Sequence, residues 1–339
     1  MRKKGDANPF KKMPTILTPE ELMDKAHRRS EKVANELRTT LIGIPRLPKS
    51  RTIEEQKIRT ISSVVSDNLL KIIDKTPSID RLKPFYKELV EVMVGIDEFK
   101  KSLGAVKWAS ELVKKLGNDY AKKARKAKVP AEASKYRKEF VGRTASILKQ
   151  IYPNLAFLAV AREKLKNLPT VKELPTLVIA GYPNVGKSTL LRKLTTAEPE
   201  INAYPFTTKG LNVGYIGEDI QVVDTPGVLD RPLYERNDIE LQAVLALNYL
   251  ANMILFVLDP SEYCGYSIGE QLNLLKEVSD LFKVPIIVAI NKIDLTDEEK
   301  LREIEEKLKD YKIIKISADK DIGLDELKET VVKELIIKN

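Results

Sequence analysis

The stretch Thr176–Leu194, TLVIAGYPNVGKSTLLRKL, decides the fold expected for the second half of the chain. Its first five residues form an apolar run that predicts a buried strand, and its last residues predict the start of a helix. Between them, Gly181–Ser188 fits the pattern G-x-x-x-x-G-K-[ST]. In such a loop the glycines let the backbone curl so that its N–H groups and the following helix N-terminus face a phosphate group. The stretch therefore predicts a P-loop within an α/β fold.

Further short apolar runs follow along the chain and alternate with longer amphipathic stretches. This alternation is typical of a mainly parallel sheet with helices on both faces. A last helix is expected from about Leu324 to Ile337. The predicted strands lie in LNVGYI (211–216), IQVVD (220–224), MILFVLD (253–259), PIIVAIN (285–291) and KIIKIS (312–317). We therefore expect residues 171–339 to form one α/β P-loop G domain.

The first half of the chain shows helical spacing instead. Thr18-Pro19-Glu20-Glu21 predicts a helix start, with Thr18 as the N-cap and Glu21 closing a capping box. Apolar residues then recur at helical intervals, and no strand pattern is sustained. We expect residues 1–170 to form an all-α helical bundle domain. The predicted helical stretches are 20–37, 53–74, 85–116 and 133–152, the last continuing toward Leu165, with breaks at 44–50, 76–84, 127–133 and 167–170.

Charge is distributed unequally between the two halves. Residues 1–170 contain 38 Lys and Arg against 20 Asp and Glu, a balance of +18, whereas residues 171–339 contain the remaining 20 and 29, a balance of −9. This contrast favours a nucleic-acid surface on the basic half, although a solvated Lys-rich helix surface gives the same count.

Cys264 is the only cysteine, which excludes an intramolecular disulfide and favours a reducing, cytoplasmic setting. No apolar run approaches ~20 residues, so no membrane span is expected.

Two motifs predict how phosphates and a metal ion are held. In the P-loop, Lys187 is expected to reach the β- and γ-phosphates, and the Ser188 hydroxyl is expected to ligate Mg²⁺. The second motif, Asp224-Thr225-Pro226-Gly227, closes a predicted strand. Asp224 is expected to hold the same Mg²⁺, and the Gly227 N–H to meet the γ-phosphate. Both motifs come from strand ends that meet at one crevice of such a sheet.

Two further motifs predict that the base is guanine. In Asn291-Lys292-Ile293-Asp294, the Asp294 carboxylate can accept both guanine N1–H and N2–H₂, a pairing that adenine cannot offer. Asn291 is expected to steady the loop and the base, and the aliphatic stem of Lys292 is expected to cover the base plane. Ser317-Ala318 supplies a backbone N–H for guanine O6. The predicted GTP- or GDP-binding residues are Gly181, Tyr182, Pro183, Asn184, Val185, Gly186, Lys187, Ser188, Thr189, Asp224, Gly227, Asn291, Lys292, Asp294, Ser317 and Ala318.

Hydrolysis is expected to be slow. Many GTPases place a glutamine after the DxxG glycine to orient the attacking water, whereas this chain has Val228, which cannot orient water. A switch threonine that ligates Mg²⁺ with GTP bound is expected within Tyr204–Lys209; Thr208 is preferred, with Thr207 as the alternative. The residues predicted to act in catalysis are Lys187, Asn184, Thr208 and Gly227, and the predicted Mg²⁺ ligands are Ser188, Thr208 and Asp224.

Two features suggest how hydrolysis is assisted. G domains with asparagine at the position of Asn184 often hold a K⁺ ion against the phosphates in place of an arginine finger. The alternative is that Asn184 only stabilises the loop, and the sequence leaves both open. Arg231 and Arg236, in the segment after Gly227, are expected to bind a partner or form salt bridges rather than to stabilise the transition state.

These motifs together resemble a known family. GYPNVGKST, YPFTTK, DTPGVLDRPLYERNDIE, LDPSEYCGYSIGEQL and NKID are similar to the Obg-related GTPases. DRPLYERNDIE, SEYCG and the segment Leu82-Lys83-Pro84-Phe85-Tyr86 resemble one branch, the nucleolar GTP-binding protein one family, in its short, archaeal form. The resemblance implies a GTPase that assists assembly of the large ribosomal subunit and contacts its rRNA, with ribosomal or assembly proteins as further partners.

The densest basic segment is the candidate rRNA contact. It contains Lys122, Lys123, Arg125, Lys126 and Lys128. Clustered Lys and Arg neutralise phosphates without reading sequence, and A-form RNA is recognised largely through shape and backbone. Arg46, Lys49 and Arg51 form a second candidate patch. For any one of these residues, a solvated helix surface is the alternative.

Other functions and roles also fit the sequence. A basic helical domain could equally hold tRNA in a translation-linked GTPase, or bind only proteins in a signalling G protein. The chain is expected to be a monomer when it is off the ribosome. Trp108 is expected in the core of the bundle, and Cys264 to pack in a loop.

Overall fold

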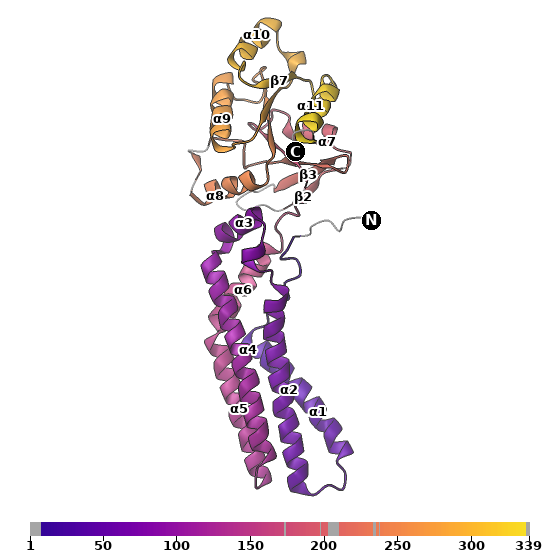
Figure 1. Ribbon diagram of the computed structural model, residues 1–339, viewed down its shortest axis with the longest axis vertical. Helices are drawn as coiled ribbons and strands as arrows, with labels where there is room; N and C mark the ends of the chain where they lie inside the picture. The colour runs from indigo at the N-terminus through magenta and orange to yellow at the C-terminus, as the bar shows by residue number, and fades with distance from the viewer. Residues whose placement is uncertain are drawn as a thin grey trace. The chain divides into compact units, whose positions relative to one another are not determined.

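The computed structural model describes residues 8–172, 174–196, 198–202, 210–232, 235–236 and 238–336. Two compact units are distinguished (Figure 1). The helical unit consists of Phe10–Ser78 and Val94–Lys166. The sheet unit consists of the described parts of Met1–Pro9, Ile79–Met93 and Asn167–Asn339.

The predicted division at residue 170 differs from these units, because the described part of Met1–Pro9, Ile79–Met93 and residues 167–170 all belong to the sheet unit. Ile79–Met93 belongs to the sheet unit although it lies within the first half of the chain. Its anchor is Tyr86, which is buried, donates its hydroxyl to the Pro169 carbonyl (2.8 Å) and accepts the Val171 N–H (3.1 Å). Tyr86, one of the residues that carry the family resemblance, therefore bonds this segment to the chain that leads into the sheet.

The helical unit is all-α, as predicted. The first helix begins at the expected capping box: the Thr18 hydroxyl accepts the Glu21 N–H (3.2 Å), and the Glu21 carboxylate accepts the Thr18 N–H (2.9 Å). Buried apolar residues recur at helical spacing along each long helix and form the core. Figure 1 shows the long helices lying side by side. They are α1 (Pro19–Thr40), α2 (Arg46–Lys75), α4 (Ile96–Arg125), α5 (Pro130–Gln150) and α6 (Tyr152–Leu165).

Some helix boundaries differ from the prediction. The single stretch expected over 85–116 is two helices, α3 (Pro84–Val94) and α4, because Gly95 has φ 76° and interrupts the helical backbone. Helix α2 begins at Arg46, before the predicted stretch 53–74. Pro48 does not prevent this, because a proline in the first turn of a helix loses no intrahelical hydrogen bond. The expectation that Trp108 lies in the core is wrong: it is 44% exposed, because it falls outside the buried stripe of α4.

Within its described residues, the sheet unit contains seven strands in the order β2-β3-β4-β1-β5-β6-β7. The five strands from β4 to β7 are parallel neighbours, while β3 pairs antiparallel with β4 and β2 antiparallel with β3. The predicted mainly parallel sheet is confirmed. The strands are β1 (Thr176–Ala180), β2 (Glu200–Asn202), β3 (Leu211–Ile216), β4 (Ile220–Asp224), β5 (Met253–Leu258), β6 (Ile286–Ile290) and β7 (Lys312–Lys315).

Helices cover both faces of this sheet. In Figure 1, α7 and α11 lie on one side and α9 lies on the other. The loops that follow β1, β4, β6 and β7 leave the same edge, because these strands are parallel. Among the residues described here, no helix has the length and apolar character to cross a membrane. The helices are α7 (Lys187–Leu194), α8 (Asp238–Ala246), α9 (Ile268–Leu281), α10 (Glu298–Lys307) and α11 (Leu324–Ile336).

Candidate nucleotide site and basic surface

The predicted P-loop lies between β1 and α7. The Lys187 ammonium is buried and donates to the carbonyls of Gly181 and Tyr182, both at 2.7 Å, which curls the loop around it. Two backbone positions are left-handed, Asn184 (φ 63°) and Gly186 (φ 107°). A Cβ at Gly186 would lie 2.3 Å from the Asn291 side-chain nitrogen, so only glycine fits there. The loop has the curled form that the sequence predicts.

The two predicted Mg²⁺ ligands that the structure describes are neighbours. The Ser188 hydroxyl donates to Asp224 Oδ2 at 2.7 Å, and the Asn212 amide donates to the same oxygen at 3.1 Å. Asp224 is fully buried, and its other oxygen, Oδ1, has no hydrogen-bond partner within the described ranges. A buried, unpaired carboxylate oxygen is costly unless a cation or donor meets it. A hydroxyl and a carboxylate are hard oxygen ligands, so this pair fits Mg²⁺.

Asn291 joins three of the motif loops. Its side-chain Nδ2 donates to the Val185 carbonyl in the P-loop at 2.8 Å, and its Oδ1 accepts the Ala318 N–H at 3.0 Å. Asn291 itself is buried. Asp294 lies in the short helix Ile293–Leu295 and is exposed. The structure therefore brings the P-loop and the two predicted guanine motifs together.

The loop after β5 supports this arrangement through residues that the sequence analysis did not single out. Lys292 is left-handed (φ 59°), and its ammonium lies 2.6 Å from Oδ2 of the buried Asp259. Asp259 also accepts the N–H groups of Ser261 (3.0 Å) and Cys264 (2.9 Å). The side chain of the buried Gln271 accepts the Asp259 N–H at 2.8 Å. An aspartate directly after a buried strand was the signal that could have identified Asp259.

Aromatic stacking connects the same loop to the P-loop. The rings of Tyr182 and Tyr266 stack with centroids 4.0 Å apart, and Tyr182 is buried. Cys264 is buried, as expected, and burial raises the pKa of its thiol. Cys264 thus belongs to the packing of a loop that contacts the predicted site.

The segment after Gly227 has its own internal bonds. The Gly227 N–H, predicted to meet a γ-phosphate, donates to Asp230 Oδ2 at 2.6 Å. The Arg236 guanidinium donates to the Gly227 carbonyl (3.2 Å) and lies 3.7 Å from Asp230 Oδ1; burial, more than the charge of Arg231, lowers the pKa of Arg236. Arg231 forms a salt bridge with Glu240 at 3.1 Å, one of its two expected roles. Val228 is buried, so it cannot face water.

The remaining predicted site residues are Pro183, Thr189, Thr207, Thr208 and Ser317. Tyr204–Lys209, which contains Thr207 and Thr208, lies outside the described residues. The Ser317 hydroxyl accepts the Lys320 N–H at 3.3 Å, which shapes the loop that carries Ala318. Pro183 and Thr189 lie in the P-loop and in the first turn of α7.

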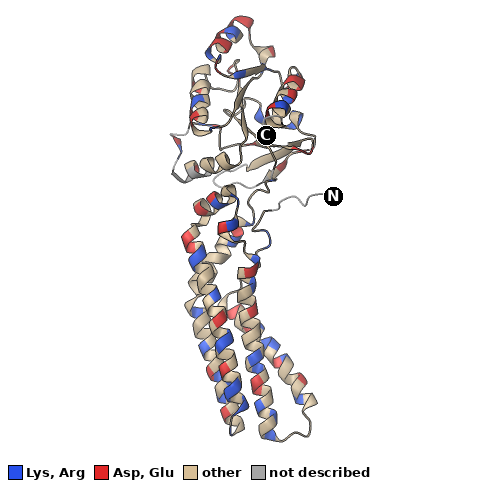
Figure 2. Cartoon of the chain, viewed as in Figure 1, with Lys and Arg blue, Asp and Glu red and all other residues tan. Residues whose placement is uncertain are grey.

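The predicted basic segment lies at the end of α4 in the helical unit. Figure 2 shows Lys and Arg along all the long helices of this unit. Lys122, Lys126 and Lys128 are exposed, Lys123 lies 4.8 Å from the Tyr120 ring, and Arg125 lies 4.0 Å from Glu55. This segment is therefore accessible to a partner.

In the second candidate patch, two of the three cationic side chains are bonded to backbone carbonyls. Lys49 donates to the Arg38 carbonyl at 3.1 Å, and Arg51 donates to the Ala127 carbonyl at 2.7 Å. These two side chains connect helix ends, whereas Arg46 is exposed. The patch is thus partly structural.

Comparison with known proteins matches both units. Residues 10–172 match the model of the NOG1 N-terminal helical domain, and residues 238–294 match the model of nucleolar GTP-binding protein 1 (NOG1). An uncharacterized Methanocaldococcus jannaschii protein, MJ1408, is 72% identical over 297 residues, 88% of this chain and 84% of that protein. Nucleolar GTP-binding protein 1 of Drosophila melanogaster is 37% identical over 298 residues, 86% of this chain and 45% of that protein.

A solved structure is also similar. A Plasmodium falciparum protein described as nucleolar GTP-binding protein 1 is 31% identical, covers 50% of this chain and 91% of its own, and has a TM-score of 0.45. The chain spans less than half the length of the Drosophila relative. The two family models and the sequence relatives confirm the resemblance carried by the motifs: the chain belongs to the nucleolar GTP-binding protein 1 family.

Proposed function

We propose that this chain binds GTP with Mg²⁺, hydrolyses it slowly, and acts as an assembly factor for the large ribosomal subunit. The observation that carries the nucleotide part is the bridge formed by Asn291, which bonds Val185 and Ala318 at 2.8 and 3.0 Å. This bridge holds the phosphate loop and the guanine loops at fixed positions. The exposed Asp294 carboxylate then accepts guanine N1–H and N2–H₂.

Each predicted site residue has a role in this proposal. Lys187 neutralises charge on the β- and γ-phosphates, and Ser188 and Asp224 hold Mg²⁺ with Thr208 or Thr207. Mg²⁺, when bound, neutralises charge that develops on the phosphate oxygens. Because the buried Val228 cannot orient water, intrinsic hydrolysis is slow. Asn184 either holds K⁺ against the phosphates or keeps the loop in shape.

The ribosomal part rests on family membership and on accessible positive charge. The relatives that name the family are called nucleolar GTP-binding proteins. The exposed segment around Lys122–Lys128 supports contact with rRNA of a large-subunit precursor, since clustered cations neutralise phosphates. In this proposal the protein is a cytoplasmic monomer off the ribosome and changes its hold on the particle with nucleotide state.

The test measures nucleotide binding and phosphate release on the same preparations. Fluorescent GDP should bind and be displaced by GTP but not by ATP, and Lys187→Ala should abolish tight binding. Phosphate release should be slow alone and faster with large ribosomal subunits. Comparing KCl with NaCl at equal ionic strength decides the role of Asn184, because equal rates would exclude K⁺ assistance. Displacement by ATP as efficient as by GTP would refute the proposed nucleotide.

A further inference from the structure

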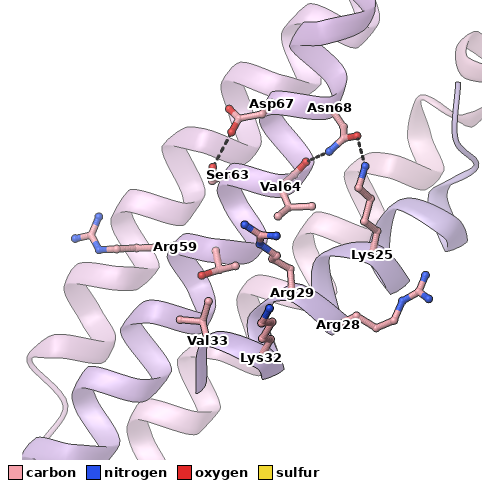
Figure 3. Close-up of a pocket in the computed structure, with 11 residues that line it drawn as sticks. Lys25, Arg28, Arg29, Lys32, Val33, Arg59, Ser63, Val64, Asp67 and Asn68 are labelled. Carbon is pink, nitrogen blue, oxygen red and sulfur yellow. Dashed lines mark hydrogen bonds between the residues drawn. The ribbon is translucent and has the colours of Figure 1, made fainter. Parts of the chain in front are cut away.

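A groove runs between α1 and α2 in the helical unit (Figure 3). The two helices are antiparallel: Lys25 donates to the Asn68 side chain at 2.9 Å, and Lys49 to the Arg38 carbonyl at 3.1 Å. One hollow in the groove has a volume of about 820 Å³. Its cationic lining residues are Lys25, Arg28, Arg29, Lys32 and Arg59, and its acidic lining residue is Asp67.

Much of this positive charge is not neutralised by the protein. Asp67 accepts from the Ser63 hydroxyl at 2.7 Å, and Arg59 is paired with Glu55 at 2.9 Å. Figure 3 shows the Lys25 ammonium bonded to the neutral amide of Asn68. Arg29 and Lys32 are exposed and form no salt bridge within the part of the chain that the structure describes. The groove is therefore short of negative charge.

The cationic side chains of α1 do not belong to its buried face. Lys25, Arg28, Arg29 and Lys32 recur at i, i+3, i+4 and i+7, which places them on one helix face. Like charges at i, i+4 destabilise a helix, and this face contains two such pairs, Lys25 with Arg29 and Arg28 with Lys32. The buried face of α1, which includes Leu22 and Ala26, already holds the helix in the core. A bound anion would offset the repulsion.

The cationic surface continues beyond the first hollow. A second hollow of about 570 Å³ shares Lys25 and Asn68 with the first and is also lined by Lys12, Lys71 and Lys75, with no Asp or Glu among its lining residues. From Arg59 to Lys75, α2 extends about 24 Å at its rise of about 1.5 Å per residue. That length accommodates several consecutive phosphates of a nucleic-acid strand.

We propose that this α1–α2 groove binds the phosphodiester backbone of an RNA strand. The inference deepens the proposed function, on which it rests for RNA as the nucleic acid. None of the exposed large hydrophobic residues of the described chain lines the groove. Protein partners are usually anchored by buried apolar or aromatic side chains, whereas backbone phosphates need only cations. The groove therefore fits a phosphate backbone better than a protein surface.

The groove is separate from the basic segment on α4. Residues Lys122–Lys128 lie beside the first part of α2, where Arg51 bonds Ala127 and Glu55 lies 4.0 Å from Arg125. The groove instead follows α2 from Arg59 to Lys75. The helical unit thus presents two cationic surfaces, which would hold RNA at two places and raise affinity by multivalency.

The test measures binding of the full chain, loaded with GDP, to a fluorescent RNA duplex by anisotropy at several KCl concentrations. The groove variant is Arg28→Gln/Arg29→Gln/Lys32→Gln. The matched control is Lys107→Gln/Lys114→Gln/Lys115→Gln, which removes the same charge from exposed positions on α4. The groove variant should lose about tenfold or more in affinity, and its salt slope should fall by roughly one per contact removed. The control variant should stay within about twofold of wild type.

Equal losses in both variants would overturn the inference, because net charge alone would then explain binding. Failure of the wild-type chain to bind the duplex would also overturn it. Polyglutamate that displaces the duplex as well as unlabelled RNA does, at equal charge, would assign the groove to acidic protein segments instead.

Sedimentation of the same variants with large ribosomal subunits separates the two proposals. If wild type and groove variant pellet equally, the groove inference fails while the proposed function stands. If wild type does not pellet although the groove binds RNA, the ribosomal function fails alone.

Discussion

The Asn291 side chain donates to the Val185 carbonyl at 2.8 Å, so the guanine loop after β6 is bonded directly to the phosphate loop after β1. The same side chain accepts the Ala318 N–H at 3.0 Å. Base recognition and phosphate binding therefore depend on one buried amide. Gly186 packs against that amide so closely that no other residue fits.

Asn291→Ala should weaken GTP and GDP binding together. The change removes both bonds and leaves the Val185 carbonyl and the Ala318 N–H unpaired, each costing about 1–3 kcal/mol. We expect affinity to fall by about tenfold or more, measured by titration with fluorescent GDP. Asn273→Ala, at an exposed position on α9, is the control and should bind normally. Unaltered affinity in Asn291→Ala would mean that the bridge does not organise the site.

Asp294→Asn should change the preferred base from guanine to xanthine. The carboxylate that accepts guanine N1–H becomes an amide, which can donate to the xanthine oxygen at C2. Competition of GTP and XTP against a labelled nucleotide measures the change, and the Lys187 contacts are untouched. A variant that still prefers GTP as strongly as wild type would refute the role given to this carboxylate.

Asp230→Ala should favour a GTP analogue over GDP. In the structure Asp230 holds the Gly227 N–H at 2.6 Å, so a γ-phosphate that takes this N–H must displace the carboxylate. Removing the competing acceptor should raise the ratio of the two affinities by several-fold, roughly the worth of one hydrogen bond to a charged group. Titrations measure the ratio of GTP-analogue to GDP affinity for Asp230→Ala and for a control variant, Asp219→Ala, which changes only an exposed turn residue. The same ratio in both variants would count against competition at Gly227.

Glu31→Gln should lower stability at neutral pH but not at acidic pH. The hydrogen bond from the buried Lys57, more than the nearby charges, lowers the pKa of Glu31 from its usual 4.5. Because the folded pKa is lowered, this contribution is present above pH 4.5 and is lost as the pH falls through the folded value. Since Glu31 is half exposed, we expect less than about 1 kcal/mol.

Thermal unfolding at neutral pH and at about pH 3 measures this loss. Glu36→Gln, on the exposed face of α1, is the matched control. A difference between Glu31→Gln and wild type that is the same at both pH values would show that the ion pair is not its cause.

Local sequence patterns predicted the features that depend on near neighbours. The capping box at Thr18 and Glu21, the strand before Gly181 and the curled P-loop are all set within a few residues, and the structure has them. The α/β class followed from alternation of strands and helices, and the family from the motifs. The break between α3 and α4 was not predicted, because the apolar residues on both sides of Gly95 keep one helical spacing. The helix nevertheless ends there, since Gly95 has a φ of 76°.

Features that depend on distant pairs were missed. Asp259 acquires its role from Lys292, which lies 33 residues further along the chain. Tyr86 joins its segment to residue 169, 83 positions away. The sequence shows that the groove residues are cationic, but not that they lie near one another. Only the packing of α1 on α2 places Arg29 and Lys71 in two adjoining hollows of one groove. No local pattern contains such information, because it arises when the chain folds back on itself.

The most direct test of the central claim is co-sedimentation of the full chain with large ribosomal subunits at about physiological salt. The protein is added without nucleotide, with GDP and with a non-hydrolysable GTP analogue, alongside Lys122→Ala/Lys123→Ala/Arg125→Ala/Lys126→Ala. We predict that wild type pellets most with the GTP analogue and that the variant loses most of this binding. Absence from the pellet in every nucleotide state, or association with free tRNA in preference to subunits, would contradict the account.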